Sequence, residues 1–128
     1  MTETRPPAAC PSLAVLNWDA LEWTPVRQGV ERKVIVTAAT TLQLVRFQPG
    51  HAINPHTHDH EQIAYILSGM LDYYVANDVG IMAAHRMVAG STLAIPAGAR
   101  HYGQNAGSEP VLNLDIFPVR REELLTRL

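Results

Sequence analysis

The chain has 128 residues, a length typical of one domain, with 47% apolar and 17% charged residues, which indicates a globular rather than a disordered protein. The formal net charge of −2 argues against binding along nucleic-acid phosphates and against a polybasic membrane anchor. The single cysteine, Cys10, excludes an intrachain disulfide and a zinc site built from several cysteines.

The N-terminus is rich in proline and shows no hydrophobic periodicity. We therefore expect residues 1–12 to form a flexible arm and residues 13–128 to form a single domain. No apolar run resembles the core of a signal peptide or a membrane span, so we expect a cytoplasmic protein with no membrane partner and no nucleic-acid partner.

From residue 34 onward, short apolar runs alternate with turn residues such as Pro49-Gly50, Ser68-Gly69 and Asn77-Asp78. This pattern predicts strands at 34–37, 42–47, 63–67, 71–76, 81–88, 91–95 and 111–117. Many short strands at close spacing are typical of a β-sandwich or a small barrel. One helix is predicted over 120–128, docked through Leu124, Leu125 and Leu128.

A cluster of histidines carries the clearest chemical signal. On a strand, His56 and His58 would point to the same face and could converge on one ion. Gln62 follows four residues later and could add a carbonyl oxygen, and His101 follows the turn at residues 96–98. If the strand of His101 pairs near the first, three nitrogens and one oxygen would meet inside the barrel.

Two neighbours of this cluster leave alternatives open. Glu61 could replace Gln62 as the oxygen ligand, because a β-bulge would reverse the alternation that points Glu61 away. We expect His60 to lie beside the site or at the surface rather than to bind an ion.

With these residues in place, the sequence resembles the cupin superfamily. The first cupin motif, G-x5-H-x-H-x3,4-E-x6-G, corresponds to Gly50, His56, His58 and Gly69, with Gln62 where glutamate is usual. The second motif, G-x5-P-x-G-x2-H-x3-N, is complete and consists of Gly90, Pro96, Gly98, His101 and Asn105.

The resemblance implies an all-β double-stranded β-helix, or jelly-roll barrel, with a short C-terminal helix. It also implies one divalent metal ion bound by His56, His58, Gln62 and His101. Because glutamine is neutral, this ligand set favours polarising an oxygen over redox chemistry. Zinc, nickel, manganese and iron(II) all suit three imidazoles and one oxygen, and a cupin that has lost its ion is the alternative.

A narrower resemblance is to small cupins that open the ring of unsaturated uronates in pectin and alginate breakdown. The string H-x-H-x-H-E-Q at residues 56–62 carries it, together with D-x-F-x3-R at Asp115, Phe117 and Arg121. It implies catalytic roles for Asp115 as acid or base and for Arg121 as a carboxylate anchor, with Phe117 against the sugar. Arg100 and Tyr102, which flank His101, are further candidate substrate-binding residues.

The expected function is therefore a metal-dependent lyase or isomerase that polarises an oxygen of a small sugar-acid-like substrate for proton transfer or ring opening. The alternatives are an aromatic polyketide cyclase, a metal-dependent dioxygenase and a non-enzymatic small-molecule-binding barrel. The resemblance also implies a homodimer, for which the segment around Trp18 and Trp23 is a candidate surface.

Overall fold

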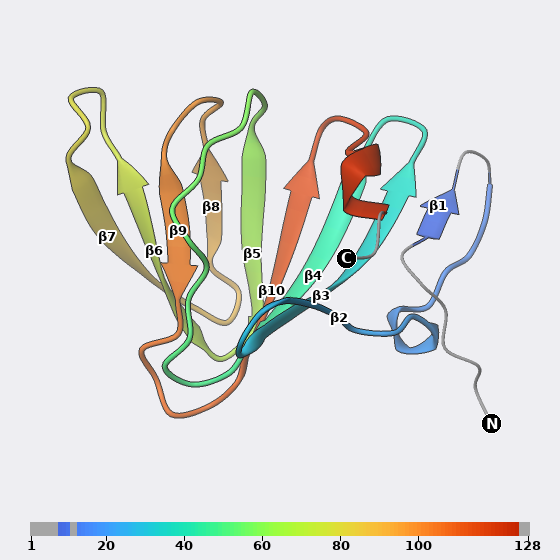
Figure 1. Cartoon of the computed structure of the whole chain (residues 1–128), viewed down its shortest axis with the longest axis horizontal. Helices are drawn as coiled ribbons and strands as arrows, with labels where there is room; N and C mark the ends of the chain where they lie inside the picture. Colours follow the sequence, from blue (N-terminus) through green and yellow to red (C-terminus); the bar gives the residue numbers. More distant parts are fainter. Residues whose placement is uncertain (1–7, 11–12, 126–128) are drawn as a thin grey trace.

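A computed structural model of the chain describes residues 8–10 and 13–125. These residues form ten strands and two short 3₁₀ helices, joined by turns and loops (Figure 1). In chain order they are β1 (Ala8–Cys10), η1 (Trp18–Ala20), β2 (Thr24–Arg27), β3 (Val30–Thr37), β4 (Thr41–Phe47), β5 (Gln62–Ser68), β6 (Met70–Ala76), β7 (Met82–Val88), β8 (Thr92–Ile95), β9 (His101–Gln104), β10 (Val111–Phe117) and η2 (Glu122–Leu125).

Two sheets face each other like the two halves of an opened barrel (Figure 1). The larger sheet has the strand order β1-β3-β4-β10-β5-β8, with β2 paired to β3, and the smaller sheet has the order β7-β6-β9. Apart from the parallel pair β1–β3, all strand pairs are antiparallel. This confirms the predicted all-β jelly-roll fold.

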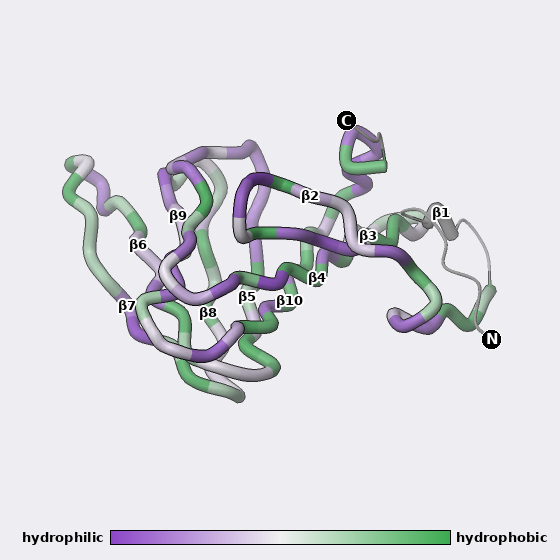
Figure 2. The backbone as a smooth tube through the Cα atoms, turned by 60° about the horizontal axis from the view of Figure 1, so that its bottom comes forward, coloured by the Kyte–Doolittle hydropathy of each residue, from purple (hydrophilic) through white to green (hydrophobic). Residues whose placement is uncertain are grey.

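The hydrophobic core fills the space between the sheets at the end where β4 and β5 finish and β10 begins. Alternate residues of the facing strands point inward, and the buried cluster consists of Val30, Val45, Phe47, Ala64, Ile66, Leu71, Tyr73, Met87, Ile95 and Val111. Hydrophobic colour concentrates on the central strands, while the β2–β3 hairpin is largely hydrophilic (Figure 2). Toward the opposite end of the barrel, buried polar side chains such as Gln62 and Asp115 lie near a smaller apolar cluster of Val34, Val36 and Leu124.

The structure contains a strand at each of the seven predicted positions and adds three more. Strands β2 and β9 were not predicted because their sequences, TPVR and HYGQ, contain no run of alternating apolar residues. Strand β1 lies within the segment expected to be a flexible arm, and it pairs in parallel with residues 35–37 of β3. The rest of that arm lies outside the described residues.

The chain end differs from the helix predicted over 120–128. The described part is a single 3₁₀ turn, η2, and Leu128 lies outside the described residues. Leu124 is buried against Val34 and Val36, with Leu125 beside it, so the predicted docking of these two leucines is confirmed. Among the described residues, no helix has the length and apolar content needed to cross a membrane.

The turn between β5 and β6 requires glycine for two reasons. Gly69 has a φ of +84°, and a Cβ atom there would lie 2.7 Å from the carbonyl oxygen of Pro110. Gly80 has a similar φ of +82° but no atom within 4 Å of its would-be Cβ. Comparing the same substitution at the two positions therefore separates the cost of backbone strain from the cost of steric overlap.

We expect Gly69→Ala to lower the free energy of unfolding by at least about 1 kcal/mol more than Gly80→Ala, because only the first adds a clash with backbone to the cost of a positive φ. Urea denaturation of both variants measures the difference. Equal destabilisation would contradict the close approach of Pro110.

Candidate metal centre

Backbone pairing brings the two histidine motifs together. The loop between β4 and β5 runs beside β9, where Ala52 bridges Gln104 and His56 bridges His101. The amide nitrogens of His56 and His101 each lie 3.0 Å from the other residue's carbonyl oxygen. The amide of Gly98 donates to the carbonyl of His58 at 2.8 Å, which fixes the turn before β9 against the same loop.

His56, His58 and His101 form one group, with ligand atoms that all lie within 4.8 Å of one another. In each ring, Nδ1 lies within hydrogen-bonding distance of a backbone carbonyl: Asn54 at 2.9 Å, His60 at 3.1 Å and Ala99 at 2.8 Å, respectively. A carbonyl only accepts, so Nδ1 carries the proton in each neutral ring. The lone pair of each Nε2 is therefore free to bind an ion.

Gln62 provides the oxygen of this group. Its Oε1 lies 3.0 Å from Nε2 of His58 and 3.1 Å from Nε2 of His101. Gln62 is the first residue of β5 and is buried, whereas its neighbour Glu61 is exposed. The regular alternation of the strand therefore turns the glutamine inward, as the sequence predicts, and leaves Glu61 outside the group.

These residues fit a divalent cation. Burial lowers the pKa of His101 to about 4, so its ring is neutral at pH 7 and its Nε2 presents a lone pair to the lone pairs of Gln62 Oε1. Such acceptors repel unless a cation lies among them. Ligands at right angles around an ion, each about 2.1 Å from it, are about 3 Å apart, which matches the separations of Gln62 Oε1 from the two imidazoles.

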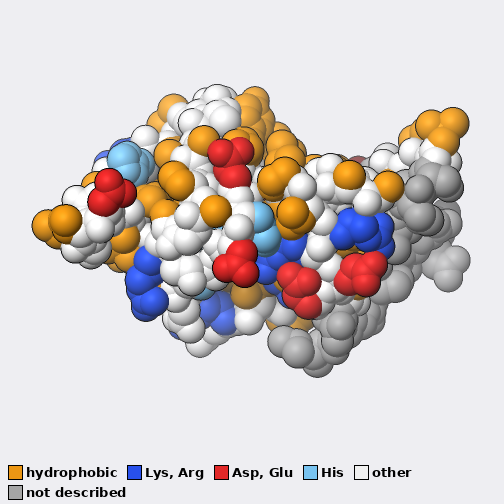
Figure 3. Space-filling model, turned by 90° about the horizontal axis from the view of Figure 1, so that it is seen from above, with side chains coloured by type: hydrophobic (Ala, Val, Ile, Leu, Met, Phe, Trp, Pro, Cys, Tyr) orange, Lys and Arg blue, Asp and Glu red, His pale blue; other side chains and the backbone are white. Residues whose placement is uncertain are grey.

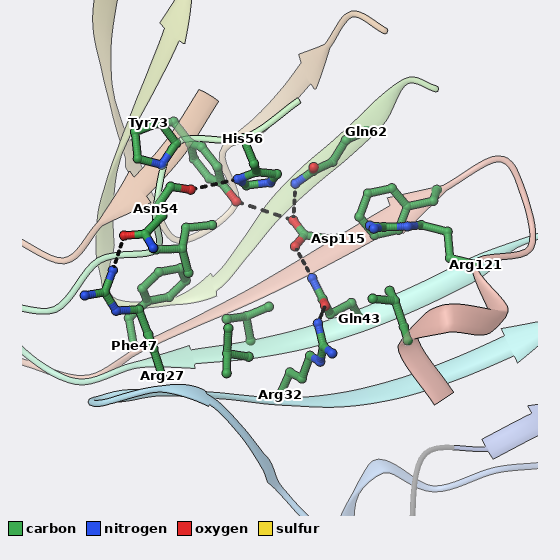
Figure 4. Close-up of a pocket in the computed structure, with 16 residues that line it drawn as sticks. Arg27, Arg32, Gln43, Phe47, Asn54, His56, Gln62, Tyr73, Asp115 and Arg121 are labelled. Atoms are coloured by element: carbon green, nitrogen blue, oxygen red, sulfur yellow. Dashed lines mark hydrogen bonds between the residues drawn. The ribbon is translucent and has the colours of Figure 1, made fainter. Parts of the chain in front are cut away.

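A buried carboxylate sets the orientation of the Gln62 amide. Asp115 Oδ1 accepts from Gln62 Nε2 and from Asn113 Nδ2, each at 2.8 Å, and Oδ2 accepts from Gln43 Nε2 at 2.9 Å. The hydroxyl of Tyr73 adds a longer contact of 3.4 Å to Oδ1 (Figure 4). Because the amide nitrogen of Gln62 is used by Asp115, its oxygen must face the histidines.

The same contact explains why glutamine replaces the usual glutamate. A carboxylate at residue 62 would put a negatively charged oxygen where Gln62 Nε2 now donates to Asp115 at 2.8 Å. Two carboxylates at that distance repel, and one would be forced to hold a proton. A neutral amide at residue 62 is thus the partner that the buried Asp115 requires.

Burial raises the pKa of Asp115 above its usual value, while the hydrogen bonds from Asn113, Gln43, Gln62 and Tyr73 oppose that shift. Burial likewise raises the pKa of Tyr73 well above its usual value, so the phenol keeps its proton and serves as a donor. The donors are divided unequally between the two carboxyl oxygens of Asp115: three contact Oδ1 and one contacts Oδ2.

A cavity of about 310 Å³ opens beside the histidines, between the two sheets (Figure 4). His56, Gln62 and Asp115 lie on one side, and three arginines, Arg27, Arg32 and Arg121, also line it. The remaining wall is mostly apolar, with Gln43, Asn54 and Tyr73 among the apolar residues Val26, Val45, Phe47, Ile53, Pro55, Phe117 and Leu124. Seen from above, histidine and arginine side chains lie together near the middle of the molecule, with acidic side chains around them (Figure 3).

Of the predicted catalytic and substrate-binding residues, Asp115, Phe117 and Arg121 line this cavity. The Arg121 guanidinium lies 4.6 Å from the centre of the Phe117 ring, and its Nε is 3.0 Å from Glu123 Oε1. Phe117 also presents its ring at right angles to His58, with centroids 5.5 Å apart. Asp115, Phe117 and Arg121 therefore share one wall, although their roles remain predictions.

Arg100 and Tyr102 do not line this cavity, and their substrate-binding roles stay predictions. Alternation in β9 points His101 inward and Tyr102 outward, where the Tyr102 ring stacks on Tyr74 with centroids 4.7 Å apart. Arg100 is exposed. The proximity of these residues to His101 in sequence therefore does not carry over to the cavity.

His60 lies next to the group, as expected, rather than within it. Its ring stacks on His58 with centroids 4.6 Å apart, and its Nδ1 is buried with no hydrogen-bond partner among the described residues. Burial, with His58 nearby, lowers the pKa of His60, which keeps that ring neutral.

Among the polar site residues that sequence reasoning missed, four lie on strands whose parity can be judged: Arg32, Gln43, Tyr73 and Asn113. A signal was present, because each has the inward parity of its strand. Gln43 is two residues before Val45, and Asn113 is two residues before Asp115. A polar residue at a position that alternation assigns to the interior indicates a polar network there.

Two facing antiparallel sheets with convergent histidines at one end define a jelly-roll protein with a possible metal site. The chain belongs to the cupin family, because the Cupin domain profile matches residues 43–117. The comparison with curated proteins found no match.

Solved structures show the same fold. KdgF from Halomonas sp. superposes with a TM-score of 0.77 and 24% identity, over 88% of this chain and 100% of that chain. Oxalate decarboxylase from Lactobacillus farciminis, in a formate complex, superposes with a TM-score of 0.73 and 25% identity, over 80% of this chain and 32% of that chain. An oxalate oxidase superposes with a TM-score of 0.66 and 21% identity, over 71% of this chain and 51% of that chain. The chain thus spans only part of the oxalate enzymes but resembles KdgF over its full length.

We expect Asp115→Asn to weaken Ni²⁺ binding by about 10- to 100-fold, because an amide cannot accept from all of the donors around it and Gln62 loses its fixed orientation. Tyr73→Phe is the matched control in the same network. It removes only the 3.4 Å contact to Asp115 and the 3.2 Å bond to Asn113, and should leave Ni²⁺ affinity close to wild type.

Calorimetric titration with Ni²⁺ alone measures both affinities. The orienting role of Asp115 would be wrong if Asp115→Asn bound Ni²⁺ as tightly as wild type while remaining folded.

Proposed function

We propose that this cupin is a metal-dependent enzyme of the lyase or isomerase type, acting on a small sugar-acid-like substrate by polarising an oxygen for proton transfer or ring opening. The observation that carries the proposal is the composition of the cavity. It joins the His56 side of the ligand group to arginines and a buried carboxyl group within about 310 Å³.

The arginines support a carboxylate-bearing substrate. Guanidinium groups bind carboxylates in a planar, bidentate manner, and three of them line a cavity large enough for a single sugar ring. The structural relatives named as oxalate enzymes are likewise named for a carboxylate.

The proposed metal ligands are His56, His58, Gln62 and His101. A divalent ion held there would supply Lewis acidity toward an oxygen of the substrate. The neutral ligand set would leave the charge of that ion undiminished, which supports non-redox chemistry. The metal identity stays open among zinc, nickel, manganese and iron(II).

Asp115 is the proposed acid or base, and its Oδ2 is the atom that would carry the proton. Three donors point at Oδ1, whereas Oδ2 accepts only from Gln43. Oδ2 therefore retains a lone pair. The raised pKa of Asp115 makes it a stronger base than an ordinary carboxylate.

Phe117 and Arg121 would position the substrate. The Phe117 ring offers an apolar surface to a sugar face, and Arg121 extends along that ring toward the cavity. The apolar wall formed by Val45, Phe47 and Ile53 favours a second candidate, an aromatic polyketide cyclase, in which the same groups would deprotonate a methylene beside a ketone.

Turnover of a 4,5-unsaturated uronate tests the proposal. Metal-loaded protein should remove the ultraviolet absorbance of the conjugated double bond, and NMR should show the ring-opened product. At saturating metal, Asp115→Asn should lower kcat by about 10²- to 10⁴-fold, as expected for loss of an acid–base group.

The control is Arg86→Gln, which should retain activity. Arg86 is an exposed residue of the edge strand β7 and pairs with Asp72 of β6. No turnover with zinc, nickel, manganese or iron(II) would overturn the sugar-acid proposal. Oxygen consumption with iron would favour a dioxygenase, and ligand binding without turnover would favour a binding barrel.

A further inference from the structure

Strand β3 carries one arginine on the inner face of the barrel. Alternation along β3 points Val30 and Val34 into buried clusters, and Arg32 lies between them and lines the cavity. The flanking residues point to the outer face, where Glu31 pairs with Arg46 and the Lys33 ammonium lies over the ring of Trp23. An inward arginine among valines requires a polar partner.

The partner that the structure gives the Arg32 guanidinium is neutral. Its Nη1 donates to Gln43 Oε1 at 3.2 Å, and no carboxylate of the described residues forms an ion pair with it. Arg121 differs, because Glu123 lies 3.0 Å from its Nε. The Arg32 charge is thus half-buried and not neutralised at close range.

Arg32 and Arg121 also line the same cavity, and the charge of Arg121 acts on Arg32. Burial lowers the pKa of Arg32, the positive charge of Arg121 lowers it further, and Glu123 opposes the shift. Two partly desolvated cations lining one cavity form a site that an anion would stabilise.

Hydrogen bonds link Arg32 to the metal centre across the large sheet. Arg32 donates to Gln43, Gln43 donates to Asp115 Oδ2, and Gln62 donates to Asp115 Oδ1 (Figure 4). Gln43 and Asp115 are direct cross-strand partners on β4 and β10, so the backbone fixes this link. Gln43 and Asp115 therefore stand between Arg32 at one end of this hydrogen-bonded chain and Gln62, beside the histidines, at the other.

We propose that Arg32, together with Arg121, forms the subsite that binds the carboxylate of an organic-acid substrate, with Gln43 holding the Arg32 guanidinium in position. The inference rests on the proposed function in taking the cavity as the substrate site. It makes Arg32 a specificity-determining residue, because the guanidinium distinguishes an acid from its neutral counterpart.

The test is calorimetric binding of galacturonate, galactose and benzoate to metal-loaded wild type, Arg32→Gln, Arg32→Lys and the control Arg86→Gln. Arg32→Gln should weaken galacturonate binding by about 10- to 100-fold, the effect of losing a hydrogen bond to a charged group. The galacturonate affinity of Arg32→Lys should lie between those of wild type and Arg32→Gln, because lysine keeps the charge without the planar guanidinium. Arg86→Gln should bind as wild type does.

Galactose, which lacks the carboxylate, should bind equally to wild type and Arg32→Gln. Metal content should be the same in all four proteins, because Arg32 is linked to the proposed ligand Gln62 only indirectly, through Gln43 and Asp115. Should Arg32→Gln prove unstable in a thermal melt, the comparison of Arg32→Lys with wild type carries the test.

Unchanged galacturonate binding in both Arg32 variants would overturn the subsite, as would equal losses for galacturonate and galactose. If galacturonate does not bind but benzoate binds in an Arg32-dependent manner, the sugar-acid function fails while the carboxylate subsite stands. If neither acid binds wild type, the subsite is wrong.

Discussion

The hydrogen bond between Gln62 and Asp115 is the interaction on which the rest of the site depends. A carboxyl group buried between two sheets needs donors, and the amide nitrogen of Gln62 is one of them. That bond leaves the amide oxygen to face His58 and His101. A carboxylate at residue 62 would be incompatible with that bond, so the buried Asp115 requires a neutral side chain beside the histidines.

The fold supports this arrangement by dividing the barrel interior along its strands. Inward residues of β4 change from Gln43 to Val45 and Phe47, and those of β10 change from Val111 to Asp115 in the opposite direction. Because the two strands are antiparallel, Gln43 lies beside Asp115 toward one end of the barrel, and Phe47 lies beside Val111 at the other. The hydrophobic core thus holds rigid the strands that position the polar network.

The three histidines depend on backbone pairing in a different way. His56 and His58 lie in the long loop before β5, outside any named strand, and the bridges Ala52–Gln104 and His56–His101 hold that loop beside β9. Backbone carbonyls then fix the imidazole orientations. The site therefore combines a loop held by β9 with side chains held by the large sheet.

Most of the fold and the convergence of three histidines could be predicted from the sequence, because alternating apolar runs mark strands and two spaced motifs mark the histidines. The inward orientation of Gln62 followed from strand parity alone. The pairing of Asp115 with Gln43 could not be predicted, since it depends on which strands are neighbours and in what register. The outward orientation of Tyr102 could not be predicted, because β9 has no apolar alternation from which to judge its parity. Arg32 was missed because an arginine in a strand is ordinarily read as a surface residue.

Metal content is the most direct test of the account. Plasma mass spectrometry of protein purified without chelator, beside His101→Ala and the exposed control His85→Ala, measures it. The account predicts about one divalent ion per chain in wild type and in His85→Ala, and its loss in folded His101→Ala. Wild-type protein that stays free of metal after zinc, nickel, manganese and iron(II) are added back would contradict it.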